Sequence, residues 1–101
     1  MEDEMETYII LGNYTQQGVG KIKESPARIV AVRKAIVAAG GKFLGWYLTM
    51  GKYDFVLITQ APDAKTVAAQ LLAVGSQGNT RTETLRAFTE DEFKGIVAGL
   101  P

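Results

Sequence analysis

Apolar side chains gather in four short runs that are typical of β-strands, at residues 7–12, 42–50, 53–60 and from residue 80 onward. Between the first two runs, Ile29, Val32 and Ile36 recur at helical spacing, and a second helical pattern covers residues 67–74. The predicted order is β-α-β-β-α-β. This is the split βαβ pattern of a ferredoxin-like α+β fold, an antiparallel sheet with helices on one face.

Short polar motifs predict where the helices begin. Ser25 followed by Pro26 is typical of an N-cap and the first helical position, and Asp63 can cap the second helix. Residues 89–92 form a capping box between Thr89 and Glu92, which predicts a short C-terminal helix.

The two central strands are predicted to form a hairpin around Gly51-Lys52, because Gly-X in a two-residue loop favours a type II′ turn. This turn pairs Thr49 with Asp54, Leu48 with Phe55 and Tyr47 with Val56. Alternation then predicts one apolar face beneath the helices, made of Leu44, Trp46, Leu48, Phe55 and Leu57 together with Ile9, Leu11, Leu85 and Ala87.

The opposite face is predicted to be half-polar, with Tyr8, Ile10, Phe43, Tyr47, Thr49, Asp54, Val56, Ile58, Thr82, Thr84 and Arg86. That set is too apolar to face water and too polar for a sealed core. Since helices cover one side of such a sheet, we expect a second copy to pack on this open face, forming a homo-oligomer.

The topology also predicts that three loops meet at one end of the sheet, namely residues 13–24, 49–54 and 75–79. Gln17 and Arg28 would lie at this end with the hairpin. If the chain binds a small molecule, this end and the adjoining sheet face are the expected place.

Composition restricts the possible chemistry. The 101 residues are enough for one domain, residues 1–101, and they include no cysteine and no histidine. Thiol catalysis, imidazole general bases and His- or Cys-ligated metals are therefore excluded, and we expect no cofactor and no metal. Eleven acidic residues balance eleven basic ones, so nucleic acid and membranes are not expected partners. Residues 1–6 are acidic, unlike a signal peptide, so they are predicted to be flexible and the chain cytoplasmic.

The hairpin motif Thr49-x-Gly51-x-Tyr53-Asp54 resembles the signature of the GYD-domain family, small bacterial and archaeal proteins of unassigned activity. The similarity continues, in the family's order, in Thr15-x-Gln17-Gly18, Pro26-x-Arg28, Gly40-Gly41, Pro62-Asp63, Gly78-Asn79 and Thr82-x-Thr84-x-Arg86-Ala87-Phe88. It covers residues 8–93. The resemblance implies a ferredoxin-like, oligomeric protein and brings no set of catalytic residues.

Six residues are candidates for ligand binding: Gln17, Arg28, Tyr47, Thr49, Tyr53 and Asp54. Asp54 could bind a cation or a ligand's donors, or act as a base; alternatively it stabilises the turn. Tyr47 and Tyr53 could position a substrate or simply pack in strands. Arg28 could hold a carboxylate or form a structural ion pair.

Two functions remain open. The leading hypothesis is a non-catalytic oligomeric domain that binds a small molecule or a protein partner. The alternative is a cofactor-independent enzyme of the dimeric α+β-barrel type, with Asp54 and a tyrosine as base and acid. The sequence does not decide between enzyme and non-enzyme.

Overall fold

The structure is a computed structural model that describes residues 4–101. Its elements are β1 (Glu6–Tyr14), α1 (Gln16–Gly20), the 3₁₀ helix η1 (Ile22–Glu24), α2 (Ser25–Ala38), β2 (Lys42–Leu48), β3 (Phe55–Ala61), α3 (Ala64–Gly75), β4 (Thr80–Ala87) and α4 (Glu90–Ala98).

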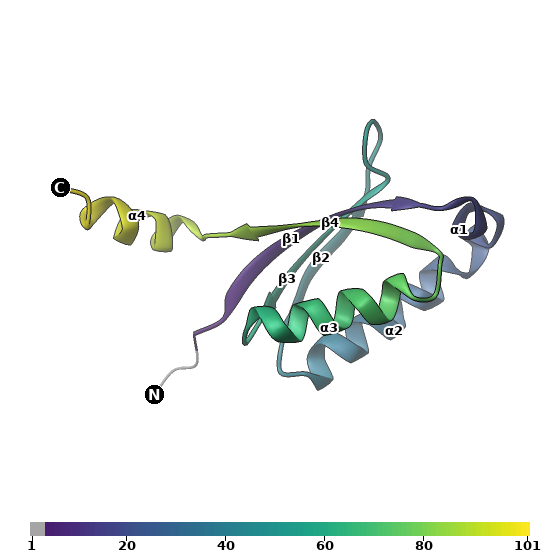
Figure 1. Cartoon of the computed structure of the whole chain (residues 1–101), viewed down its shortest axis with the longest axis horizontal. Coiled ribbons are helices and arrows are strands. Elements are labelled where there is room, and N and C mark those ends of the chain that lie inside the picture. Colours follow the sequence, from purple (N-terminus) through teal and green to yellow (C-terminus); the bar gives the residue numbers. More distant parts are fainter. Residues whose placement is uncertain (1–3) are drawn as a thin grey trace.

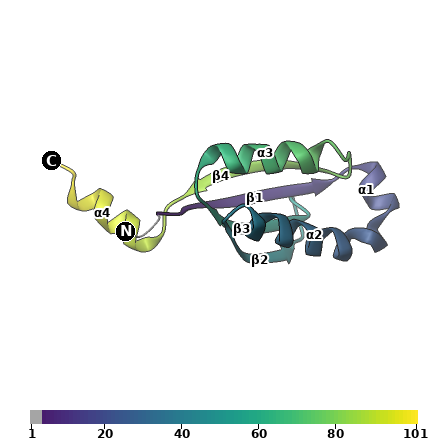
Figure 2. The ribbon, with the colours of Figure 1, turned by 90° about the horizontal axis from the view of Figure 1, so that it is seen from below.

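The strands form one antiparallel sheet in the order β2-β3-β1-β4. Helices α2 and α3 lie side by side on the same face of this sheet (Figures 1 and 2). The predicted ferredoxin-like α+β fold is therefore confirmed, including its additional C-terminal helix.

The core lies between the sheet and these two helices. One cluster joins Tyr8 and Ala61 of the sheet to Val67 of α3, and a second joins Ile10 and Leu57 to Ile36 of α2. Gly12 continues this face of β1, and a Cβ at this position would lie 2.0 Å from the Phe55 ring. The absence of a side chain there allows Phe55 to pack across the central strand.

The predicted sheet faces were right for β3 and wrong for β1 and β4. Ile10 pairs with Leu57 and Tyr8 with Arg86, so Tyr8, Ile10, Thr82, Thr84 and Arg86 are on the helix side. Ile9 pairs with Ile58 and Leu85, which places these residues on the opposite face. Because β1 is apolar at consecutive positions, its sequence alone does not distinguish its two faces, and a shift of one residue exchanges them.

Strand β2 also departs from simple alternation. Its register with β3 shifts between Phe43 and Gly45, as at a β-bulge. Phe43 therefore packs against the cluster of Ile10, Ile36 and Leu57 on the helix side, and Leu44 is 51% exposed. Both residues had been predicted on the opposite faces.

The hairpin keeps its predicted pairing but has a longer connection than a two-residue turn. Leu48 pairs with Phe55 and Tyr47 with Val56, as expected. The strands end at Leu48 and resume at Phe55, and the Thr49 amide closes the loop by donating to the Asp54 carbonyl at 2.8 Å. Gly51 has φ +105°, the left-handed conformation for which glycine is suited.

The segment predicted as one long loop, residues 13–24, is largely regular. Strand β1 continues to Tyr14, and α1 and η1 occupy most of the remainder. Ser25 is the first residue of α2 instead of its N-cap, and its hydroxyl lies 2.7 Å from the Tyr14 hydroxyl. The tertiary contact with Tyr14 thus replaces the local capping bond that Ser25-Pro26 predicted.

The other two helix starts match the prediction. The Thr89 and Glu92 side chains form the capping box of α4, and Asp63 caps α3.

Of the predicted flexible segment 1–6, residues 1–3 lie outside the described residues. Glu6 belongs to β1, where its carboxylate accepts a hydrogen bond from the Tyr8 hydroxyl.

Helix α4 projects beyond the end of the sheet, away from α2 and α3 (Figure 1). Its apolar side chains Phe93, Ile96 and Val97 are 59%, 48% and 46% exposed.

Among residues 4–101, no helix has the length and apolar character needed to cross a membrane.

The Asp63 carboxylate accepts bonds from the Thr66 amide at 2.9 Å and the Thr66 hydroxyl at 2.8 Å. The bond from the amide, followed by that from the hydroxyl, lowers the pKa of Asp63 below its ordinary value. The pKa of Asp63 is lower in the folded state than in the unfolded state. The stabilisation from its ionised carboxylate is therefore fully present above the unfolded-state pKa, and it is lost as the pH falls through the folded-state pKa.

Asp63→Asn tests this linkage, because asparagine also caps helices but does not titrate. We expect the melting temperature of the wild type, measured relative to Asp63→Asn, to be constant near neutrality and to fall below about pH 4. Circular dichroism melts across this pH range measure the difference. A difference that does not change with acidification would contradict the assignment.

Candidate functional site

Asp54 connects the hairpin to the end of the central strand β1. Its carboxylate accepts a bond from the Tyr14 amide at 3.0 Å, and its own amide donates to the Gly12 carbonyl at 2.8 Å and to Asn13 Oδ1 at 3.2 Å. These bonds tie residues about forty positions apart in the sequence. Asp54 therefore has a structural role as an acceptor of a backbone amide.

Thr49 and Tyr53 complete this hairpin end. The Thr49 hydroxyl donates to the Tyr53 carbonyl at 2.7 Å, and the Tyr53 hydroxyl donates to Glu83 of β4 at 2.7 Å. The bond to the Glu83 carboxylate is the main cause that raises the pKa of Tyr53 above its ordinary value. Tyr53 thus joins the hairpin loop to β4 as a donor to Glu83.

Gln17 connects α1 to the loop before β4. Its side-chain amide nitrogen donates to the Gln77 carbonyl and to Asn79 Oδ1, both at 2.9 Å. In the same region the Thr15 amide donates to the Asn79 carbonyl at 3.0 Å. The predicted meeting of the three loops at one end of the sheet is observed, and hydrogen bonds between their own residues account for it.

Tyr47 lies apart from this loop cluster, whereas Arg28 borders it, because its guanidinium donates to the Lys21 carbonyl of the 13–24 segment at 3.5 Å. Arg28, the fourth residue of α2, pairs with Glu24 at 2.9 Å, and its side chain is 25% exposed. Tyr47 lies on the face of the sheet opposite the helices and is 58% exposed. Of the six predicted residues, five lie at or beside this end of the sheet, and Tyr47 lies on the face opposite the helices.

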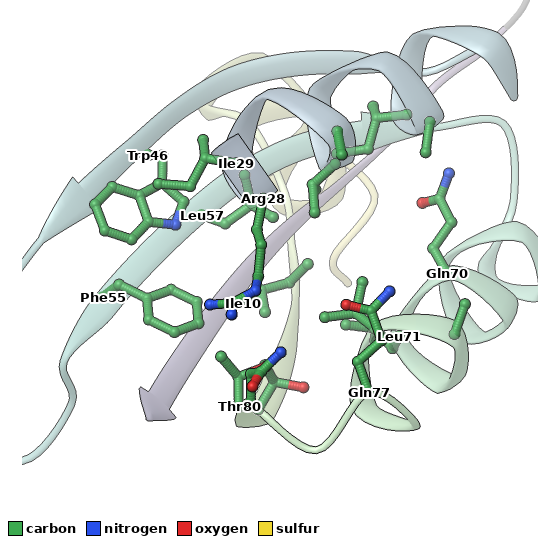
Figure 3. Close-up of a pocket in the computed structure, with 18 of the residues that line it drawn as sticks. Ile10, Arg28, Ile29, Trp46, Phe55, Leu57, Gln70, Leu71, Gln77 and Thr80 are labelled. Atoms are coloured by element: carbon green, nitrogen blue, oxygen red, sulfur yellow. The ribbon is translucent and has the colours of Figure 1, made fainter. Parts of the chain in front are cut away.

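A cavity of about 300 Å³ lies between the sheet and helices α2 and α3. Figure 3 shows it bounded by Trp46, Phe55 and Leu57 of the sheet, by Ile29 of α2 and by Leu71 of α3. Arg28 is the one predicted site residue that lines it; Asp54, Tyr47, Tyr53, Thr49 and Gln17 do not.

Sequence reasoning expected Gln77 at this end of the sheet but missed Tyr14 and Thr80 as residues of the cavity. Tyr14 is the last residue of β1, and Thr80 is the first residue of β4. Alternation in β4 indicated that Thr80 and Thr82 share a face. Only the register with β1 shows that this face is the one under the helices.

The face opposite the helices carries apolar residues from all four strands. We call this surface the open face: Ile9, Leu11, Tyr47, Val56, Ile58 and Leu85. Tyr47 and Leu85 are 58% and 43% exposed. Within residues 4–101, no helix packs over it (Figure 1).

Carboxylates do not gather into a metal site in the described part of the chain, residues 4–101, where no group of three or more potential ligands is present. Asp54 accepts the Tyr14 amide and Asp63 caps α3, so each carboxylate has a local role.

The sequence profile described as "GYD domain" matches residues 8–97. The chain belongs to the GYD domain family. The GYD family motif, Thr49 to Asp54, is thus the hairpin loop whose bonds fasten it to β1. In this protein the residues of the motif maintain the end of the sheet.

A relative from Thermus thermophilus, named "Glutamine synthetase and cystathionine beta-lyase binding protein", is 36% identical over 84 residues. The match covers 82% of this GYD-domain chain and 88% of the relative. The crystal structure of MtbAldR resembles this chain with a TM-score of 0.66 at 17% identity. That match covers 84% of this chain and 52% of the longer MtbAldR chain, and it supports the fold alone.

Asp54→Ala should lower the free energy of unfolding by about 1–3 kcal/mol, because it leaves the partly buried Tyr14 amide without its acceptor. Asp54→Asn keeps an oxygen at this position and should cost less. Urea unfolding of both variants measures the difference. Equal stability of Asp54→Ala and the wild type would show that this bond does not hold the hairpin.

Proposed function

We propose that this protein is a non-catalytic, protein-binding domain that self-associates through the open face of its sheet. The observation that carries the proposal is the uncovered apolar surface formed by all four strands. A relative that is named as a binding protein for two enzymes supports the same class of function.

An antiparallel sheet with one face in water normally alternates apolar and polar side chains. Here the central pair does not: Ile9 lies opposite Ile58, and Leu11 opposite Val56, on the face without helices. Contiguous apolar surface of this kind is characteristic of protein–protein contacts. A second copy offers the same surface, so a two-fold contact between open faces would cover both at once.

Helix α4 is a second uncovered apolar surface. The side chains of Phe93 and Val97 are one helical turn apart, with Ile96 beside them, and all three are exposed. Helix α4 projects beyond the sheet (Figure 2), so we expect it to remain accessible when two open faces are in contact. We therefore assign α4 to contact with a different protein.

The named partners of the Thermus thermophilus relative indicate which proteins to test. In this proposal the present chain binds glutamine synthetase, cystathionine beta-lyase or both. Its role would then be to attach to these enzymes as an oligomer, without itself performing chemistry.

The enzyme alternative relied on Asp54 with Tyr47 or Tyr53. Asp54 is engaged by the Tyr14 amide, Tyr53 by Glu83, and none of the three lines the cavity. No specific observation favours this alternative, and the binding function is the better supported one.

Leu85→Glu is expected to convert the oligomer to a monomer, because the new carboxylate would be desolvated between two open faces. Val30→Glu is the matched control, since Val30 on the outside of α2 is 44% exposed and Leu85 is 43% exposed. Size-exclusion chromatography with light scattering measures the mass, and circular dichroism verifies folding. A monomeric wild type at micromolar concentration would contradict self-association, as would a Leu85→Glu variant that still assembles.

Phe93→Glu is expected to weaken binding to purified glutamine synthetase or cystathionine beta-lyase while leaving the oligomer intact. Lys94→Glu, on the same helix, changes charge without removing an apolar side chain and should bind nearly as the wild type. Biolayer interferometry with each enzyme measures the affinity. If neither enzyme binds the wild type, the partner assignment is wrong; if Phe93→Glu binds normally, α4 is not the contact.

A further inference from the structure

The cavity between the sheet and helices α2 and α3 has the size and composition of a ligand site. Its volume of about 300 Å³ is at the lower end of the range for small-molecule pockets. The walls are mostly aliphatic and aromatic, from Ile10, Leu57, Ile29, Ile36, Leu71 and Val74. This volume equals that of roughly ten water molecules in the liquid.

Two polar side chains of the cavity wall, Arg28 and Thr80, can donate hydrogen bonds to a negatively charged group of a ligand. In Figure 3 the Arg28 side chain extends from α2 between Phe55 and Gln77, toward Thr80. Within residues 4–101, the buried Thr80 hydroxyl has no hydrogen-bond partner. A buried hydroxyl without a partner costs free energy, and rotation about the Thr80 Cα–Cβ bond would turn it toward the cavity that Thr80 lines, where it would donate to a ligand oxygen.

Arg28 remains able to bind a ligand. Its two bonds, to Glu24 at 2.9 Å and to the Lys21 carbonyl at 3.5 Å, use only some of its N–H groups. The Glu24 side chain is 66% exposed, and such surface ion pairs contribute little to stability. Exchange of this partner for a ligand carboxylate would therefore cost little.

We propose that the cavity binds a small monocarboxylate with an apolar body, such as a short fatty acid or an arylacetic acid. Its apolar part fills the space beneath α2 and α3, and its carboxylate accepts hydrogen bonds from Arg28 and Thr80. The cavity and the open face lie on opposite faces of the sheet, so this site does not depend on the proposed self-association.

Charge selects a monocarboxylate over a phosphate ester. Arg28 supplies one positive charge, and the Glu24 carboxylate at 2.9 Å already offsets part of it, so a second negative charge on the ligand is disfavoured. A dianionic phosphate would leave negative charge in an apolar cavity close to the Glu24 carboxylate. Because Arg28 is 25% exposed, the charged head also stays near solvent while the apolar body is buried.

Trp46 makes the site directly observable. It is the single tryptophan of the chain, and it lines the cavity while stacked on Phe55 at a centroid distance of 5.4 Å. A ligand in the cavity should change its fluorescence. The same ligand should raise the melting temperature, and the rise should continue with the logarithm of the ligand concentration above Kd.

The experiment titrates the full chain with hexanoate and phenylacetate, each against its neutral alcohol, and with hexyl phosphate. We expect the carboxylates to bind about tenfold more tightly than the alcohols. No change in Trp46 fluorescence or melting temperature at millimolar hexanoate would overturn the proposal. Tighter binding of hexyl phosphate than of hexanoate would overturn the ligand class.

Variants then locate the site. Arg28→Gln should remove the preference for carboxylate over alcohol, whereas Lys34→Gln, the loss of a charge elsewhere on α2, should preserve it. Ala31→Leu on α2 and Ala73→Leu on α3 fill the cavity from opposite sides and should abolish both kinds of binding. An unchanged preference in Arg28→Gln, or unchanged affinity in both filling variants, would contradict the assignment.

Thr80→Val separates a ligand contact from a structural role. Replacement of an unpartnered buried hydroxyl by a methyl should preserve or raise the melting temperature of the free protein. The same variant should bind hexanoate more weakly. A loss of stability without a loss of affinity would contradict the role of Thr80 in binding.

Discussion

The sheet carries apolar side chains on both of its faces, but two helices can cover only one. Ile10 and Leu57 pack beneath α2 and α3, and their neighbours Ile9 and Ile58 point away from these helices. Burial of apolar surface is the main favourable contribution to folding and association. The uncovered set is therefore available for association, and the proposed self-association follows from this asymmetry.

The face of the sheet that α2 and α3 cover contains a cavity. Helices α2 and α3 cover the sheet without filling the space beneath them, and the cavity remains between Trp46, Phe55 and the two helices (Figure 3). Protein interiors are normally packed without voids of this size. The proposed carboxylate site accounts for this space, with Arg28 at its edge and Thr80 in its wall.

The family motif has a different role from either surface. Asp54 and Thr49 use their polar atoms to close the hairpin loop and to join it to β1, and Tyr53 reaches across to Glu83 of β4. These contacts fasten all the strands near one end of the sheet. A family motif can thus consist of residues that maintain the fold, with the binding surfaces formed by less distinctive residues elsewhere.

By itself the sequence determined the order of the four strands and of α2, α3 and α4, the capping of α3 and α4, the pairing of Leu48 with Phe55, and the family, but not α1 and η1. These features depend on local signals: periodicity, capping side chains and the residues of a turn. Only the tertiary structure decided which face of β1 meets the helices, because Tyr8-Ile9-Ile10-Leu11 is apolar at every position and either register is locally acceptable. That choice, made by the packing of Ile10 and Gly12 against Leu57 and Phe55, determines both the open face and the residues that line the cavity.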